Sequence, residues 1–277
     1  MLVDSHCHLQ DPKFKSDVDS VIARAVSAGV TAMVTVGYDM PSSRRAIEIA
    51  DSYENVYATI GVHPHDARTL KPKDVDELAR MADSAKVVAV GEIGFDFYRN
   101  LSPREEQERA FHAQLELARS LSLPVVIHSR DADEDTYAVL AEYENQARPD
   151  WPKDRPIGVM HCYAGDLPLA LRYIEIGFVI SIAGTVTYPN NKSGRAVAGG
   201  IPLRWMTVET DAPYLPPQSE RGKRNEPAYV LDTASFIAET RGCSLAEVCD
   251  KTATTAAWLF GLGDIGEPAS ETAKGPR

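Results

Sequence analysis

Val30-Thr31-Ala32-Met33-Val34-Thr35-Val36 is the stretch that decides the fold, because it is rich in β-branched residues and free of charged side chains. A strand of this composition is typical of a parallel sheet that is covered by helices on both faces. One expected helix, residues 17–28, precedes it and ends at Gly29, and a second, residues 41–53, follows it. The sequence around this stretch therefore predicts a strand–loop–helix alternation.

The same alternation continues along the whole chain. We expect eight strands, at residues 2–6, 30–36, 56–62, 87–93, 123–128, 157–161, 178–182 and 205–210. Further helices are expected at residues 73–84, 102–120, 133–143, 167–175, 227–240 and 244–260. Strands that alternate with helices form a parallel sheet with right-handed crossovers, and a closed barrel accommodates eight of them better than an open sheet.

The expected fold is therefore of the α/β class, a single-domain (β/α)8 TIM barrel over residues 1–262. The length of 277 residues is close to the usual size of such a barrel. The tail, residues 263–277, is rich in Gly, Pro, Ser and charged residues and is expected to be flexible.

Composition narrows the class of protein. The hydrophobic content of 44% and the charged content of 25% are ordinary for a soluble globular protein. No apolar run is long enough to span a bilayer and no leader segment precedes the first strand, so we expect a cytoplasmic protein with no membrane contact. No obligate protein partner is evident. The net charge of −11 argues against a broad basic surface for nucleic acid, but it leaves room for local phosphate contacts.

Histidine is concentrated where expected strands end. Five of the seven histidines occupy such positions: His6, His8, His63, His128 and His161. His6 and His8 are two apart on a strand, so their side chains point the same way. Neutral imidazole is a common ligand of borderline divalent metals. These positions therefore favour a metal centre.

Two carboxylates complete the candidate centre. Glu92 lies near the end of the fourth expected strand, and Asp211 follows the eighth. In a barrel, all carboxyl ends of the strands converge on one mouth, where barrel enzymes keep their active sites. Glu92 is well placed to bridge two cations, and such a pair can share a hydroxide and stabilise both oxygens of a displacement. Taken singly, either carboxylate could instead be a salt-bridge partner at the barrel mouth.

Cysteine is not expected to contribute to this centre. The four cysteines show no CxxC spacing, which fits a reducing compartment without disulfides. Cys7 and Cys162 each adjoin a candidate ligand, and strand alternation would turn them away from the site as small buried hydrophobic residues.

These segments resemble the TatD-type metal-dependent DNases, a branch of the amidohydrolase superfamily. The resemblance runs from Leu2 to about Gly261, and its main segments are Asp4-Ser5-His6-Cys7-His8-Leu9, Gly61-Val62-His63-Pro64-His65, Gly91-Glu92-Ile93-Gly94-Phe95-Asp96, Pro124-Val125-Val126-Ile127-His128-Ser129-Arg130, His161-Cys162-Tyr163-Ala164-Gly165, Glu209-Thr210-Asp211-Ala212-Pro213-Tyr214-Leu215 and Arg221-Gly222-Lys223-Arg224-Asn225-Glu226-Pro227. The segment 161–165 departs from the commoner His-Cys-Phe-Ser-Gly form of the family, because it has Tyr163 and Ala164 at the third and fourth positions. Many superfamily relatives bridge their metals with a carbamylated lysine on the fourth strand, where this chain has Glu92.

The resemblance implies a divalent-metal-dependent deoxyribonuclease, a 3′-5′ exonuclease, that hydrolyses DNA phosphodiesters with a metal-activated water. Its implied metal ligands are His6, His8, Glu92, His128, His161 and Asp211. We expect His6, His8 and Asp211 to hold one of two cations and His128 and His161 the other, with Glu92 between them. The cations implied by the donors and the family are Mg²⁺, Mn²⁺ or Zn²⁺.

The expected catalytic residues are Glu92, Asp211 and His63. Asp211 would orient or deprotonate the attacking water, and His63 would donate a hydrogen bond to a phosphoryl or leaving-group oxygen. The alternative for His63 is that it only caps its loop.

Substrate contacts are expected on loops near the mouth. The candidate substrate-binding residues are His63, Arg130, Arg221, Lys223 and Arg224, with Lys192 and Arg195 nearby. Tyr163, Tyr188 and Tyr214 could stack on unpaired bases. An acidic protein with a local basic edge should favour single-stranded DNA or strand ends. Three other functions stay open: a small-molecule amidohydrolase or phosphotriesterase-like hydrolase, an aminoacyl-tRNA ester hydrolase, and a catalytically silent binding protein.

Overall fold

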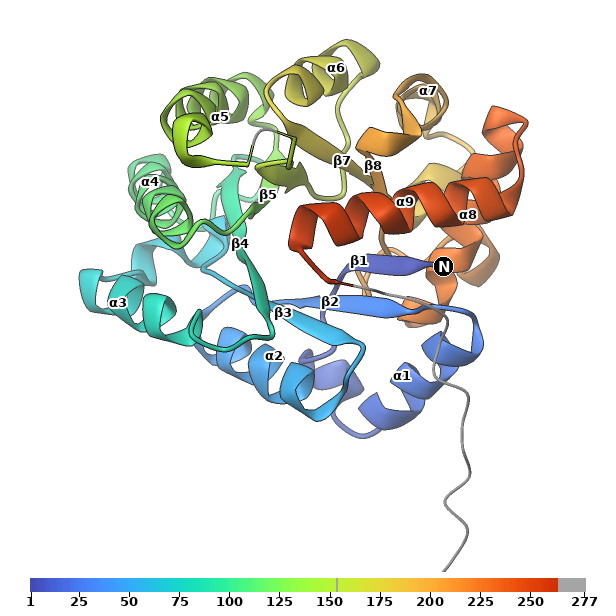
Figure 1. The fold of residues 1–277 in the computed structure, drawn as a ribbon, viewed down its shortest axis with the longest axis horizontal. Helices are drawn as coiled ribbons and strands as arrows, with labels where there is room; N and C mark the ends of the chain where they lie inside the picture. The colour runs from blue at the N-terminus through green and yellow to red at the C-terminus, as the bar shows by residue number, and fades with distance from the viewer. Residues whose placement is uncertain (153, 264–277) are drawn as a thin grey trace, which may run out of the picture.

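Eight parallel strands form a barrel, as the sequence predicts. The computed structural model describes residues 1–152 and 154–263. The strands lie side by side in chain order, from β1 to β8. Cys7, at the end of β1, pairs with Ala212, just beyond β8, and this pairing closes the ring. Helices surround the strands on the outside (Figure 1).

The strands and helices alternate along the chain. The strands are β1 (Val3–Cys7), β2 (Ala32–Val36), β3 (Val56–Ile60), β4 (Val87–Asp96), β5 (Val125–Arg130), β6 (Gly158–Met160), β7 (Phe178–Ile182) and β8 (Met206–Val208). The helices are α1 (Val18–Ser27), α2 (Met40–Ser52), α3 (Pro72–Met81), α4 (Arg104–Leu121), α5 (Asp133–Ala147), α6 (Leu167–Glu175), α7 (Lys192–Gly200), α8 (Val230–Arg241) and α9 (Leu245–Phe260).

Two differences from the predicted elements have physical reasons. α7 was not predicted, because three of its nine residues are glycine, which lowers helix propensity. It forms because Asn191 caps it, accepting a hydrogen bond from the Gly194 N–H, and because Val197 and Ala198 are buried against the core. Lys192 and Arg195, expected on a loop, therefore belong to a helix.

The fourth strand is longer than predicted. It continues to Asp96 because residues 93–96 pair in register with 127–130 of β5. The predicted flexible tail lies, apart from Gly263, outside the described residues, so that prediction stays untested.

The hydrophobic core has one layer inside the barrel and another beneath the helices. Inside, valines from most of the strands pack against Ala256, Leu259 and Phe260 of α9. α9 thus covers the end at which the strands begin (Figure 1), and the opposite end is free for polar side chains. Among the described helices, none combines the length and apolar character needed to cross a membrane.

The loop after β8 is held tightly to the first part of the chain. The buried Asp4 carboxylate accepts hydrogen bonds from the Thr210 amide, at 2.9 Å, and from its hydroxyl, at 2.6 Å. Asn225 Nδ2 donates to the carbonyl oxygens of Thr210 and Tyr214. Next to Asn225, Glu226 accepts hydrogen bonds from Arg24 of α1 and from Arg224. These contacts fix the position of Asp211.

We expect Glu226→Gln to lower the free energy of unfolding by about 2 kcal/mol near neutral pH, since two arginines lose a shared charged acceptor. Burial raises the pKa of Glu226, but the hydrogen bonds from Arg24 and Arg224 outweigh it and hold the pKa below its usual range. A carboxyl with a lowered folded pKa stabilises above its unfolded pKa, and this stability is lost as pH falls through the folded value. Urea unfolding as a function of pH measures the effect.

The difference between wild type and variant should therefore shrink as pH falls below about 4.3, the ordinary glutamate pKa. Glu48→Gln is the matched control, because the Glu48 carboxylate pairs with Arg45 on the exposed surface and should contribute less than about 1 kcal/mol. A difference that stays constant into strong acid would show that the charge on Glu226 is not the cause.

Candidate metal centre

His6 and His8 project from the end of β1 to the same side, as strand alternation predicts. Their Nε2 atoms are 3.3 Å apart. Asp211 Oδ1 lies 3.3 Å from His8 Nε2 and 3.8 Å from His6 Nε2. Cys7 between them turns into the hydrophobic core, where its Sγ donates to the Val34 carbonyl oxygen, as predicted. Two imidazole nitrogens and a carboxylate oxygen therefore converge in one buried place.

Glu92 lies in the middle of the site, close to four histidines. Its Oε1 atom lies 2.8 Å from His128 Nδ1, 3.5 Å from His63 Nε2 and 3.7 Å from His161 Nε2. Its Oε2 atom lies 3.6 Å from His6 Nε2. One buried carboxylate from β4 thus faces histidines that follow or end four other elements.

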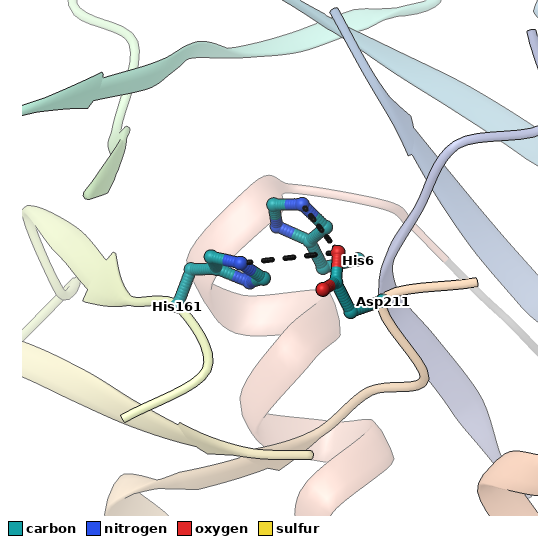
Figure 2. A group of neighbouring side chains, drawn as sticks. All are labelled: His6, His161 and Asp211. Atoms are coloured by element: carbon teal, nitrogen blue, oxygen red, sulfur yellow. Dashed lines mark ion pairs between the residues drawn. The ribbon is translucent and has the colours of Figure 1, made fainter. Parts of the chain in front are cut away.

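His161 links the two sides of this arrangement. Its ring stacks on the ring of His6 with centroids 3.5 Å apart, and its Nε2 lies 4.0 Å from Asp211 Oδ1. Figure 2 shows these two imidazoles side by side with the Asp211 carboxylate facing both. All six predicted ligands therefore meet at one site, whereas the division of their side chains between two cations stays a prediction.

The chemistry of the donors suits divalent cations. Three overlapping groups each bring their ligand atoms within 4.8 Å of one another: His6, His8 and Glu92; His6, His161 and Asp211; and His63, Glu92 and His128. Nδ1 of His6 is buried without a hydrogen-bond partner in the described ranges, 1–152 and 154–263. Buried imidazole nitrogens beside carboxylate oxygens are a donor set that Zn²⁺ and Mn²⁺ accept.

Both carboxylates of the centre are ionised at neutral pH. Burial raises the pKa of Glu92, but the charge on His161, together with the hydrogen bond from His128, outweighs it and holds the pKa well below its usual range. Burial likewise raises the pKa of Asp211, and the hydrogen bond from His8 outweighs it. The centre therefore presents negative charge to a cation.

Asp96 is a further buried carboxylate beside the centre, and it was not predicted from the sequence. Its Oδ2 atom accepts hydrogen bonds from His128 Nε2, at 3.1 Å, and from His65 Nε2, at 2.9 Å. This leaves the Nδ1 atom of His128 facing Glu92. Asp96 is four residues after Glu92 and on the same face of β4, so a longer predicted strand would have found it.

Glu209 is a buried ion-pair partner of His161. Its Oε1 atom lies 2.8 Å from His161 Nδ1 and accepts a hydrogen bond from the Cys162 amide. Its Oε2 atom accepts from the Ser181 hydroxyl, at 2.6 Å. The Nε2 atom of His161 is thereby directed toward Glu92. The signal in the sequence was the position of Glu209, two residues before Asp211 at the end of β8.

Cys162 does not lie as predicted. It is only half-buried, and its Sγ lies within 4.8 Å of ligand atoms of His161 and Glu209. Its φ of 44° is the reason, because a left-handed residue interrupts the alternation of side chains that a strand would impose. All four cysteines are free, as expected.

His63 both caps a loop and faces the centre. Its Nδ1 atom accepts a hydrogen bond from the His65 amide at the start of a short 3-10 helix, Pro64–Thr69. The neutral ring must then carry its proton on Nε2, the atom nearest Glu92. Burial and the nearby charge of His128 lower the pKa of His63 to about 4, so the ring is neutral at physiological pH. His63 therefore caps the loop and also faces the centre, and its catalytic role stays a prediction.

The centre opens into a cavity of about 560 Å³. Its walls include His63 and Arg130 from the predicted substrate-binding set. Six lining residues were not predicted as part of the site: Tyr38, His65, Asp66, Arg99, Leu101 and Leu215. Tyr214 also lines the cavity, and its hydroxyl donates to Asp11 Oδ2 at 2.7 Å.

The structure does not bring Arg221, Lys223 and Arg224 to this cavity. Arg224 forms a bidentate pair with Asp17, and Lys223 Nζ lies 2.7 Å from Glu220. The Arg221 guanidinium lies over the Tyr188 ring at 4.5 Å. The basic loop after β8, residues 221–224, is therefore largely engaged by partners within the protein. One of these partners, Asp17, lies far away in the sequence, at the start of α1.

Comparison with known proteins gives one consistent result. Residues 3–261 match the model of a family described as TatD related DNase. The chain is 37% identical over 260 residues to an uncharacterized metal-dependent hydrolase, YabD, of Bacillus subtilis, covering 94% of this chain and 99% of that one. It is 35% identical over 268 residues to a protein of Klebsiella pneumoniae named 3′-5′ ssDNA/RNA exonuclease TatD, covering 94% and 98%.

A solved structure agrees with these sequence matches. The crystal structure of YJJV, a TatD homolog from Escherichia coli, superposes with a TM-score of 0.86 at 30% identity. The superposition covers 94% of this chain and 98% of that one.

We expect Asp96→Asn to lower the affinity for Mn²⁺ or Zn²⁺ by about 10- to 100-fold, the usual effect of removing a carboxylate that orients a histidine ligand. A neutral amide cannot serve as the charged acceptor of two imidazole N–H groups. Competition with a chromophoric chelator measures the affinity. Asp66→Asn is the control, because Asp66 lines the same cavity without holding His128. Equal affinities for wild type and Asp96→Asn would refute this role.

Proposed function

Because the chain belongs to the TatD-related DNase family, we propose that it is a divalent-metal-dependent nuclease that removes nucleotides from the 3′ end of DNA. Family membership makes it a metal-dependent hydrolase that acts on phosphodiester bonds. The observation that carries the finer proposal is the convergence of buried Glu92 with four histidines beside an open cavity that includes arginine side chains.

The six ligands have proposed places. His6, His8 and Asp211 would hold one cation, His128 and His161 would hold the other, and Glu92 would serve both. Bound divalent cations supply Lewis acidity, which polarises a phosphoryl oxygen and makes water a stronger nucleophile near neutral pH. Mg²⁺, Mn²⁺ and Zn²⁺ are each compatible with part of this mixed nitrogen and oxygen donor set.

The protein's own groups then act on the reacting atoms. The Asp211 carboxylate orients the attacking water and accepts its proton, because it is ionised and lies at the edge of the cavity. The His63 Nε2–H donates a hydrogen bond to a phosphoryl or leaving-group oxygen. Glu92 fixes the mutual position of the histidines around it.

The cavity supports a nucleotide substrate over the small-molecule alternatives. A hydrolase for small amides, lactones or phosphotriesters needs an enclosed apolar pocket, whereas this cavity is walled by histidines, two arginines and tyrosines. The Klebsiella relative's name supports a single-stranded substrate and places RNA beside DNA as a candidate. Hydrolysis of an aminoacyl ester on tRNA is the remaining alternative.

Removal of divalent cations should abolish hydrolysis, and adding Mg²⁺, Mn²⁺ or Zn²⁺ separately should restore it. The test compares end-labelled single-stranded DNA, single-stranded RNA, an aminoacyl-tRNA and a phosphotriester. We expect shortening of the DNA from its 3′ end, visible as a ladder when the 5′ end carries the label. Restoration of activity toward only the phosphotriester or only the aminoacyl ester would refute the nuclease proposal.

Glu92→Gln should reduce DNA hydrolysis by on the order of 100-fold or more, the scale of losing one charge-stabilising group at a reacting centre. The amide keeps the shape of the side chain but removes the negative charge that four histidines share. Metal content by mass spectrometry should fall in parallel. Glu116→Gln on the outer face of α4 is the control for the same chemical change. Full activity and full metal content in Glu92→Gln would exclude this scheme.

A further inference from the structure

Unpaired positive charge at the mouth lies after β4 and at the end of β5. Arg99 and Arg130 are exposed and both line the cavity. Neither guanidinium forms an ion pair with a carboxylate in the part of the chain that the structure describes, residues 1–152 and 154–263. This is the reverse of the loop after β8, where Lys223 and Arg224 are paired.

An exposed aromatic side chain accompanies these arginines. The Arg130 guanidinium lies 4.0 Å from the centroid of the Tyr98 ring. Tyr98 is nevertheless 61% exposed, so much of its ring faces solvent, and Leu101 beside it is 55% exposed. Exposed apolar side chains are informative where they gather beside a cavity, and these two lie within four residues of each other at its rim. We call Tyr98, Arg99, Leu101 and Arg130 the β4–β5 edge.

The β4–β5 edge is fixed in register with the metal centre. The Arg99 amide donates to Asp96 Oδ1 at 2.7 Å, and the Phe97 amide donates to the Arg130 carbonyl oxygen at 2.9 Å. Asp96 is the same carboxylate that holds His128. A ligand group that binds at this edge would therefore lie at a fixed distance from the metal centre.

Acidic groups on other elements also lie at or near the cavity. Asp66 lines the cavity from the short helix after β3. The Tyr214 hydroxyl is already engaged by the carboxylate of Asp11. An anionic polymer would be attracted to the β4–β5 edge, where two cavity-lining arginines have no carboxylate partner among the described residues.

We propose, resting on the proposed nuclease function, that single-stranded nucleic acid leaves the centre over the β4–β5 edge. Arg99 and Arg130 contact backbone phosphates next to the one being cleaved, and Tyr98 stacks on an unpaired base. Stacking of this kind tolerates any sequence, because every base has an aromatic face. The edge, and not the basic loop after β8, thus selects a strand over a small phosphodiester.

The experiment compares the catalytic efficiency, kcat/KM, for a long oligothymidylate with that for a dithymidylate, using the metal-loaded enzyme. A variant that damages the centre itself lowers kcat/KM for both substrates equally, so the ratio of the two values reports only on contacts with the longer strand. We expect Arg99→Gln and Tyr98→Ala each to lower this ratio about tenfold. Arg99→Gln should also make the dependence of KM on salt shallower, since one phosphate contact is lost. Arg119→Gln, which removes an arginine from the outer face of α4, is the matched control and should leave the ratio unchanged.

Three results would overturn this inference. If wild type cleaves oligothymidylate and both variants keep its ratio, the strand does not cross the β4–β5 edge, and the nuclease proposal survives. If Arg221→Gln lowers the ratio while Arg99→Gln does not, the strand follows the loop after β8. If wild type cleaves neither DNA nor RNA with any of the three metals, both proposals fail together.

Discussion

The burial of one ionised carboxylate, Glu92, is the constraint on which the centre depends. A lone carboxylate in such surroundings would be strongly destabilising or protonated. It stays ionised because imidazoles from the ends of several strands surround it. The barrel is what makes this possible, since only a closed ring of parallel strands brings residues from across the chain to one mouth.

The histidines in turn depend on an outer ring of carboxylates. Asp96 and Glu209 lie behind His128 and His161, each next to the ring nitrogen that does not face Glu92. Carboxylates that orient histidines in this way are as much a part of metal chemistry as the ligands themselves. These buried carboxylates also account for part of the negative net charge of the chain, which would be offset when divalent cations bind.

Much of the centre could be predicted from the sequence, because strand alternation and the carboxyl ends of strands follow simple geometric rules. His6, His8 and Glu92 meet as those rules require. Asp96 escaped prediction because its strand runs further than its β-branched residues indicate. Arg224 was misjudged for another reason: its partner Asp17 is more than 200 residues away, and no local pattern reveals such a pairing. Charge near a site in sequence is therefore a poor guide to charge that is available in space.

The closure of the barrel has a consequence for biosynthesis. The hydrogen bonds between Asp4 and Thr210 join residues 206 positions apart, and the Asp211 amide bonds to the His6 carbonyl oxygen. A chain that emerges from the ribosome amino end first carries His6 and His8 long before Asp211 exists. The metal centre therefore cannot be completed on a partial chain. A fragment that ends before Asp211 would therefore lack one of the six proposed ligands.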